Sequence, residues 1–282
     1  MAAATGSFRY HGHRITYDVH GEGERVLVLV HGLLMNRRMY EKLAPEMASR
    51  GNRVVAIDLL GHGDSDKPQD MRIYSMSSFA NQVVALIDHL GLAPPVVGGT
   101  SLGANVTLEL AVHHPERARG LLIEMPVLED ALLGAALTFT PILVSLRFGK
   151  PLLSLLAAAT ERVPRSNYVA DILLDWMRRD PGTSRAVLEG VLFAGAAPPR
   201  EERKEIEQPS LVIGHPADPL HPFSDADILV EELPNARLVD ANSILEWRLT
   251  PKRLDDELAR FLDGVYAEGQ ATGERPARAA SG

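Results

Sequence analysis

The fold is decided by the stretch VVGGTSLGAN, residues 96–105. Its first part, Val96–Gly98, predicts a short buried strand, and the apolar period of Leu102–His113 predicts a helix that follows at once. Ser101 therefore lies in a G-x-S-x-G sequence at a sharp strand-to-helix turn, which exposes the serine oxygen above a sheet. The two glycines of this motif fit the turn, because a larger side chain would clash across it. We expect Ser101 to be a nucleophile.

Short aliphatic runs recur on both sides of this stretch and predict further strands. The unbroken apolar run Val26–Val30 is typical of a central strand covered by helices on both faces. Between the runs, segments such as Ser77–Leu90 place their apolar residues on one helical stripe. This alternation predicts an α/β fold with a mostly parallel sheet. The expected strands are Arg14–Val19, Arg25–Val30, Val54–Ile57, Val96–Gly98, Leu121–Met125, Ser210–Ile213 and Arg237–Val239.

The alternation stops after Met125, and residues 126–209 show only helical periodicity. One helix carries apolar residues from Val169 to Met177, and another is expected to begin with Thr183 or Ser184 as its N-cap. We therefore predict a core of residues 8–125 and 210–262 and a helical cap of residues 126–209. Residues 263–282 are polar, small and rich in helix breakers, which predicts a disordered tail.

Composition excludes several classes of protein. The 282 residues are 45% hydrophobic and 23% charged, and the net charge is −8. This balance is that of a folded globular protein, and it disfavours a partner that is a nucleic acid. The chain has no cysteine, which excludes disulfides and a cysteine nucleophile. The apolar charge-free run of residues 131–146 is shorter than the roughly 20 residues of a membrane-spanning helix, so no stable membrane insertion is expected.

Two further loops complete the pattern around Ser101. His31-Gly32-Leu33-Leu34 ends the second expected strand, and the backbone N–H groups of Leu33 and Leu102 are the expected donors of an oxyanion hole. The segment 58–65, with sequence DLLGHGDS, is a glycine-punctuated loop expected to shape the rim of the site. The sequence indicates no metal and no cofactor.

In this order, the motifs resemble those of the α/β-hydrolase superfamily over about residues 8–262. The segment 214–222, GHPADPLHP, resembles the loop that carries the catalytic acid in that family. The resemblance implies an α/β-hydrolase fold in which the helical block is the cap. A serine in the nucleophile position argues against the dehalogenase and epoxide hydrolase branches, which use an aspartate there.

The chain departs from the family pattern at the catalytic histidine. The family places this residue on the loop after the last strand. Here that loop, residues 240–247, contains no histidine, and the last histidine of the chain is His221. Because a serine hydroxyl needs a base within reach, we expect His221 to replace the missing residue. His215, His31 and His62 also flank the expected site and are alternatives.

Two carboxylates are candidates for the acid that orients the base. Asp218 occupies the position that matches the family's usual acid. Glu124 ends a strand among apolar residues, where a carboxylate needs a partner and where some relatives carry the acid instead. The residues leave both possibilities open.

These observations predict an enzyme, namely a hydrolase that acts on a small hydrophobic ester, lactone or thioester through a non-standard triad. The alternative keeps the fold without hydrolysis and assigns the pocket to small-molecule binding, or to a lyase or cyclase reaction. No secretory signal pattern is visible at the N-terminus, so a cytoplasmic location is expected.

Overall fold

A computed structural model describes residues 3–160, 163–164, 168–218 and 220–271. Its centre is one sheet with the strand order β1-β2-β4-β3-β5-β6-β7-β8. From β4 onward along this order neighbouring strands are parallel, whereas β2 is antiparallel to both β1 and β4. The fold predicted from the sequence is confirmed. The strands are β1 (Ala4–Tyr10), β2 (His13–His20), β3 (Val26–Val30), β4 (Arg53–Asp58), β5 (Val96–Thr100), β6 (Gly120–Glu124), β7 (Ser210–Gly214) and β8 (Ala236–Asp240).

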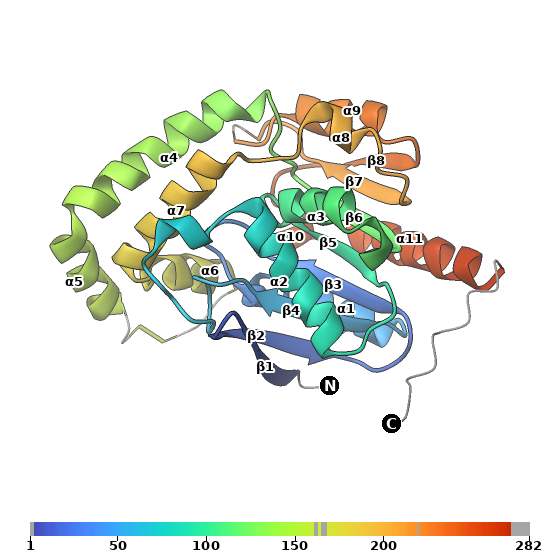
Figure 1. Cartoon of the computed structure of the whole chain (residues 1–282), viewed down its shortest axis with the longest axis horizontal. Helices are drawn as coiled ribbons and strands as arrows, with labels where there is room; N and C mark the ends of the chain where they lie inside the picture. Colours follow the sequence, from blue (N-terminus) through green and yellow to red (C-terminus); the bar gives the residue numbers. More distant parts are fainter. Residues whose placement is uncertain (1–2, 161–162, 165–167, 219, 272–282) are drawn as a thin grey trace.

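Helices cover both faces of this sheet (Figure 1). One face packs on α2 (Met76–His89), α3 (Leu102–His113) and α9 (Phe223–Glu232) in a cluster that includes Phe79 and Leu108. The other face packs on α1 (Leu43–Ser49) and α11 (Lys252–Ala271) through side chains such as Met47 and Leu258. These two buried layers explain why β3, β5, β6 and β7 are apolar on both faces.

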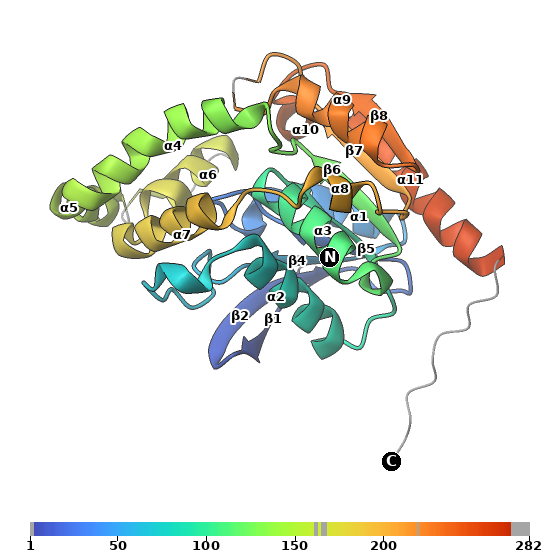
Figure 2. The same cartoon turned by 45° about the horizontal axis from the view of Figure 1, so that its top comes forward.

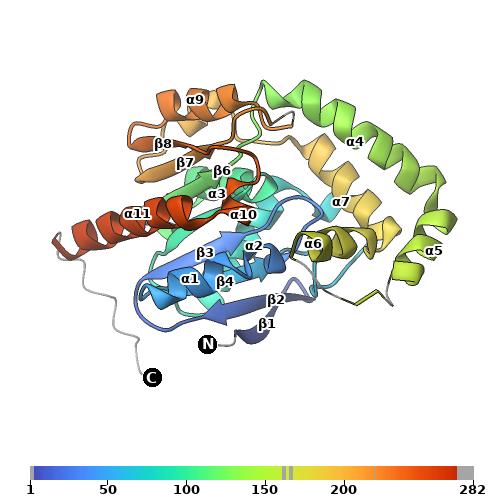
Figure 3. The ribbon, with the colours of Figure 1, turned by 180° about the vertical axis from the view of Figure 1, so that it is seen from behind.

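Helices also account for all regular structure between β6 and β7 in the described residues. Figures 2 and 3 show α4 to α7 gathered beside the sheet as a separate layer. Helix α7 begins earlier than expected, because Asp180 caps it by accepting a hydrogen bond from the Thr183 N–H at 2.6 Å, with Pro181 in the first turn. The segment contains α4 (Ala131–Phe148), α5 (Lys150–Thr160), α6 (Tyr168–Met177), α7 (Pro181–Ala194) and α8 (Arg200–Arg203), and the short α10 (Glu246–Leu249) precedes α11.

Two boundaries differ from the sequence prediction. Strand β1 begins at Ala4, before the expected start of the core at residue 8. Helix α11 continues to Ala271, so residues 263–271 are helical rather than disordered. The extension is held because Val265 packs into the core and the Tyr266 hydroxyl bonds the backbone of Val26. The remaining tail residues lie outside the described part of the chain.

Helix α4 is predominantly apolar, with Arg147 in its last turn. Its 18 residues have a mean hydropathy of 1.7 and 11% of them are buried, which makes it long and apolar enough to cross a membrane by length and composition alone. The helix passes through Pro141 and exceeds the charge-free run noted in the sequence. At about 1.5 Å per residue it spans about 27 Å, slightly less than a bilayer's hydrocarbon core. That the protein makes no stable membrane insertion stays a prediction.

Candidate active site

Ser101 occupies a sharp turn between β5 and α3. Its φ of 56° lies in the left-handed region, which a non-glycine residue adopts only where the surroundings enforce it. A Cβ at Gly99 or at Gly103 would collide with the carbonyl oxygen of Val30 on the neighbouring strand. The two glycines thus let β3, β5 and the start of α3 approach one another, and this approach sets the position of Ser101.

His221 reaches Ser101 from the loop after β7. Its Nε2 lies 2.8 Å from Ser101 Oγ, and its Nδ1 lies 2.8 Å from Asp218 Oδ2. A proton on Nδ1, facing the carboxylate, leaves Nε2 free to accept the hydrogen bond of the serine hydroxyl. Both side chains of this pair are nearly buried, with 11% of His221 and 10% of Asp218 exposed. Ser101, His221 and Asp218 therefore form one continuous hydrogen-bonded chain, which we call the relay.

Asp218 is fixed as an anion. Burial opposes its ionisation, but the contact with His221 and the backbone N–H groups of Leu220 and His221 hold the pKa of its carboxyl below the usual range. Those two N–H groups donate to Asp218 Oδ1 at 2.8 and 3.1 Å, while Oδ2 faces the imidazole. One carboxylate thus orders the turn of the loop and orients the histidine.

Glu124 belongs to a different cluster. It is 2% exposed at the end of β6, where its carboxylate accepts a hydrogen bond from Arg248 Nη2 at 2.9 Å and lies 3.2 Å from His215 Nε2. The Thr100 hydroxyl also donates to it. Burial raises the pKa of Glu124, but Arg248 and His215 more than offset this and lower it to about 2. The structure brings together Ser101, His221 and Asp218, and it places Glu124 with His215 instead.

The other candidate histidines bond the backbone beneath the site. His31 Nε2 accepts from the Leu59 N–H at 3.1 Å, and His62 Nε2 accepts from the Leu34 N–H at 3.3 Å. Burial lowers the pKa of His31 to about 4 and that of His62 well below its ordinary value, so both rings are neutral. Their role in this arrangement is to hold the loop that contains Leu33.

Leu33 and Leu102 line one pocket together with Ser101. Leu102 is the first residue of α3, where a helix leaves its N–H group without an intrahelical acceptor. The pocket has a volume of about 180 Å³ and is mostly apolar. Its roof comes from α4 and α7, which belong to the predicted cap, and its other walls come from the predicted core. The apolar lining includes Met76, Val127, Leu132, Ala135, Phe139 and Val191.

Asn105 is a site residue that the sequence analysis missed. It lies one helical turn after Ser101 and is buried, and its side-chain amide donates to the carbonyl oxygens of Val127 at 2.7 Å and Ala196 at 2.6 Å. Its Oδ1 accepts from the Val127 N–H at 3.0 Å. One residue therefore binds both chain segments that connect the cap to the core. Its i+4 spacing from Ser101 was the available signal.

The described residues contain no group of three or more histidine, aspartate or glutamate side chains that could hold a metal ion. The arrangement therefore places a serine hydroxyl, an imidazole and a carboxylate in hydrogen-bond contact beside a mostly apolar pocket.

Comparisons with known proteins agree with this architecture. A family model described as alpha/beta hydrolase fold matches residues 25–162. The chain is 27% identical to the 2-hydroxymuconate semialdehyde hydrolase of Pseudomonas putida over 242 residues, which are 79% of this chain and 80% of that protein.

Solved structures show the same fold at low sequence identity. A hydrolase from Pseudomonas aeruginosa superposes with a TM-score of 0.76 at 22% identity, covering 92% of this chain and 98% of that one. The enol-lactonase from Burkholderia xenovorans superposes with a TM-score of 0.74 at 22% identity, covering 92% of this chain and 100% of that one. Together with the sheet order and the turn at Ser101, these matches show that the chain has the α/β-hydrolase fold, and they support its membership of the α/β-hydrolase superfamily.

Proposed function

We propose that the protein is a serine hydrolase that cleaves a small, largely apolar ester, lactone or thioester. The observation that carries this proposal is the relay in which His221 lies 2.8 Å from both Ser101 Oγ and Asp218 Oδ2. These distances are those over which a general base takes a proton from a nucleophile. The 27% identity to a semialdehyde hydrolase supports the hydrolase class.

In the proposed reaction, Ser101 Oγ attacks the acyl carbon while His221 Nε2 takes the hydroxyl proton. Asp218 stabilises the imidazolium that forms. The N–H groups of Leu33 and Leu102 donate to the oxyanion of the tetrahedral intermediate. His221 then gives its proton to the leaving oxygen or sulfur, and an acyl-enzyme remains. Water attacks this ester, His221 takes the water's proton, and its return to Ser101 releases the acid.

The chemistry of the pocket limits the substrate. Its walls are leucine, valine, alanine, methionine and phenylalanine side chains from both core and cap. Such a lining favours an apolar acyl or alcohol group. The non-hydrolytic alternative was based on the absence of a histidine after β8. The distance of 2.8 Å between His221 Nε2 and Ser101 Oγ favours the hydrolase proposal over it. A cytoplasmic location remains part of the proposal.

The test combines turnover with labelling. Purified protein is assayed on 4-nitrophenyl esters with acyl chains of two to eight carbons and on lactones and thioesters, and it is treated with a fluorophosphonate probe. We expect turnover and covalent labelling by the wild type, and neither by Ser101→Ala. Ser49→Ala, on the exposed face of α1, is the matched control and should behave as the wild type. No turnover on any substrate together with no labelling of Ser101 would overturn the proposal.

A further inference from the structure

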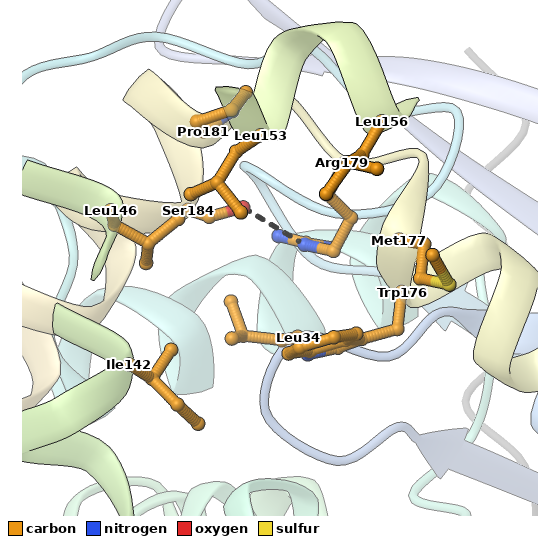
Figure 4. Close-up of a pocket in the computed structure, with 10 residues that line it drawn as sticks. All are labelled: Leu34, Ile142, Leu146, Leu153, Leu156, Trp176, Met177, Arg179, Pro181 and Ser184. Atoms are coloured by element: carbon orange, nitrogen blue, oxygen red, sulfur yellow. Dashed lines mark hydrogen bonds between the residues drawn. The ribbon is translucent and has the colours of Figure 1, made fainter. Parts of the chain in front are cut away.

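A second cavity lies beneath the cap, next to the pocket that contains Ser101. It has a volume of about 130 Å³. Its walls are mostly apolar and come from the four helices α4 to α7 and from one core loop (Figure 4). They include Leu34, Ile142, Leu146, Leu153, Leu156 and Trp176.

One cation lies in this apolar setting. The guanidinium of Arg179 points into the cavity between Ser184 and Leu34 (Figure 4). In the described part of the chain its three nitrogens reach neutral acceptors: Ser184 Oγ at 3.3 Å, the Met35 carbonyl at 3.4 Å and the Gly61 carbonyl at 2.8 Å. Burial lowers the pKa of Arg179 to about 10, with attraction to Asp58 opposing the shift, so the group is charged at neutral pH. A buried cation is costly unless an anion accompanies it.

Two carboxylates attract Arg179, namely Asp58 and Asp180, and Asp180 accepts hydrogen bonds from Gln69 and Thr183. Asp58 is fully buried and forms an ion pair with Arg37. Arg37 also pairs with Asp18 at 2.9 Å and with Asp64 at 2.9 Å. On its other side Arg179 borders a polar pocket lined by four further cations, Arg37, Arg38, Lys67 and Arg178, and by two carboxylates, Asp64 and Asp175. In the described residues Arg179 is thus attracted by Asp58 and Asp180 but forms no hydrogen bond with either carboxylate, and its guanidinium faces the apolar cavity.

The two cavities follow one another along the same elements. Leu33 lines the Ser101 pocket and its neighbour Leu34 lines the Arg179 cavity. Helix α4 roofs both, with Phe139 over the first and Ile142 over the second, less than one helical turn further on. An elongated molecule under α4 would therefore have one end at Ser101 and its other end near Arg179.

We propose that the Arg179 cavity binds the carboxylate end of a substrate whose acyl group lies at Ser101, with an apolar chain between them. This inference rests on the proposed hydrolase function and specifies its substrate class. One guanidinium matches one carboxylate in charge, and its planar donors match the two carboxylate oxygens. A phosphate dianion fits less well, because the remaining walls offer it little beyond the Ser184 hydroxyl.

The kinetic test uses substrate pairs that differ only in charge. Mono-4-nitrophenyl esters of dicarboxylic acids with four to eight carbons are compared with the same esters methylated at the free carboxyl. The wild type should prefer the acid form at one chain length. Arg179→Gln, which keeps hydrogen-bond donors but loses the charge, should lower kcat/KM for that acid by about 10- to 100-fold, mainly through KM. It should change the methylated substrate little, and Arg179→Lys should recover part of the loss.

Arg178→Gln is the matched control. Arg178 is the neighbouring cation, but it bonds the carbonyl oxygens of Thr160 and Val163 and does not line the apolar cavity. The Arg178→Gln variant should keep the wild-type preference for the acid form of the ester over the methylated form. Equal kcat/KM for acid and methylated esters at every length would overturn the proposal, as would an acid preference that survives Arg179→Gln.

A binding measurement separates this inference from the proposed function. Calorimetry with octanoate and with 1-octanol as probes requires no turnover. Octanoate binding that Arg179→Gln weakens about tenfold or more, with octanol unaffected, supports the anion cavity even if no ester is cleaved; the hydrolase proposal alone would then fail. Ester turnover without any Arg179-dependent octanoate binding would overturn the cavity assignment and leave the hydrolase proposal standing.

Discussion

Asp218 and His221 lie three residues apart in one loop, and their side chains face each other at 2.8 Å. In this chain the proposed base and the proposed orienting acid therefore lie in the same loop after β7. The same carboxylate accepts the His221 backbone N–H at 3.1 Å, so the turn that presents the imidazole is stabilised by the group that orients it. Any distortion of this turn would displace both members from Ser101.

His221→Ala should reduce ester turnover by about 10²–10⁴-fold, because it removes the general base. Asp218→Asn should also cause a large loss, since it removes the negative charge that stabilises the imidazolium. Steady-state kinetics on the best ester from the panel provides the measurement. His113→Ala, on the exposed end of α3, is the control and should leave turnover unchanged. Near wild-type rates in both site variants would exclude the relay.

Glu124→Gln should affect stability more than chemistry. Its carboxylate is held by Arg248 and His215 with a pKa of about 2, lower than the ordinary value of 4.5. A lowered folded-state pKa means that the stabilisation is complete above about pH 4.5 and is lost as the pH falls toward 2. We expect the variant to unfold about 3 kcal/mol more easily than the wild type at pH 7, with a smaller gap at pH 3.

Denaturant titrations at the two pH values measure this difference. Turnover by the folded Glu124→Gln variant should stay within a few-fold of the wild type. A loss as large as that of Asp218→Asn would instead mean that Glu124 acts on the base, which was the other possibility left open by the sequence.

The parts of the structure that depend on residues adjacent in the sequence could be predicted. The strand-turn-helix around Ser101 depends on glycines and on apolar runs that adjoin it, and the fold inferred from them is confirmed. The parts that depend on contacts between residues far apart in the sequence could not be predicted. Nothing near Tyr266 in sequence shows that its hydroxyl bonds Val26, 240 residues away, and so the helical extension was missed. Arg179 was missed for the same reason, because its apolar surroundings come from the four separate helices α4 to α7 and from a core loop.

Asn105→Ala should loosen the cap. The substitution removes three hydrogen bonds to the two segments that connect the predicted cap and core, and it leaves partly buried backbone groups of Val127 and Ala196 without that partner. We expect a loss of about 2–4 kcal/mol in the free energy of unfolding. Backbone amides at 126–132 and 195–197 should exchange with solvent faster, as followed by hydrogen-exchange mass spectrometry. Asn81→Ala removes a surface bond to His114 and serves as control. Unchanged exchange at both segments would show that Asn105 does not hold the cap.

Tyr266→Phe should destabilise the fold through the far end of α11. The hydroxyl accepts from the Val26 N–H at 2.8 Å and donates to the Val26 carbonyl at 2.6 Å, so its loss leaves two backbone groups of β3 without this partner. We expect a decrease of about 1–3 kcal/mol in the free energy of unfolding at pH 7.

Burial raises the pKa of Tyr266, and a raised folded-state pKa means that this stabilisation is present below about pH 10 and is lost as the pH rises further. The gap between Tyr266→Phe and the wild type should therefore narrow above pH 10 in denaturant titrations. Asp263→Asn breaks only an exposed ion pair with Arg25 in the same part of the helix, and it should change stability by less than about 1 kcal/mol. If Tyr266→Phe were as stable as the wild type at pH 7, the hydroxyl would not be what holds the extension of α11 to the sheet.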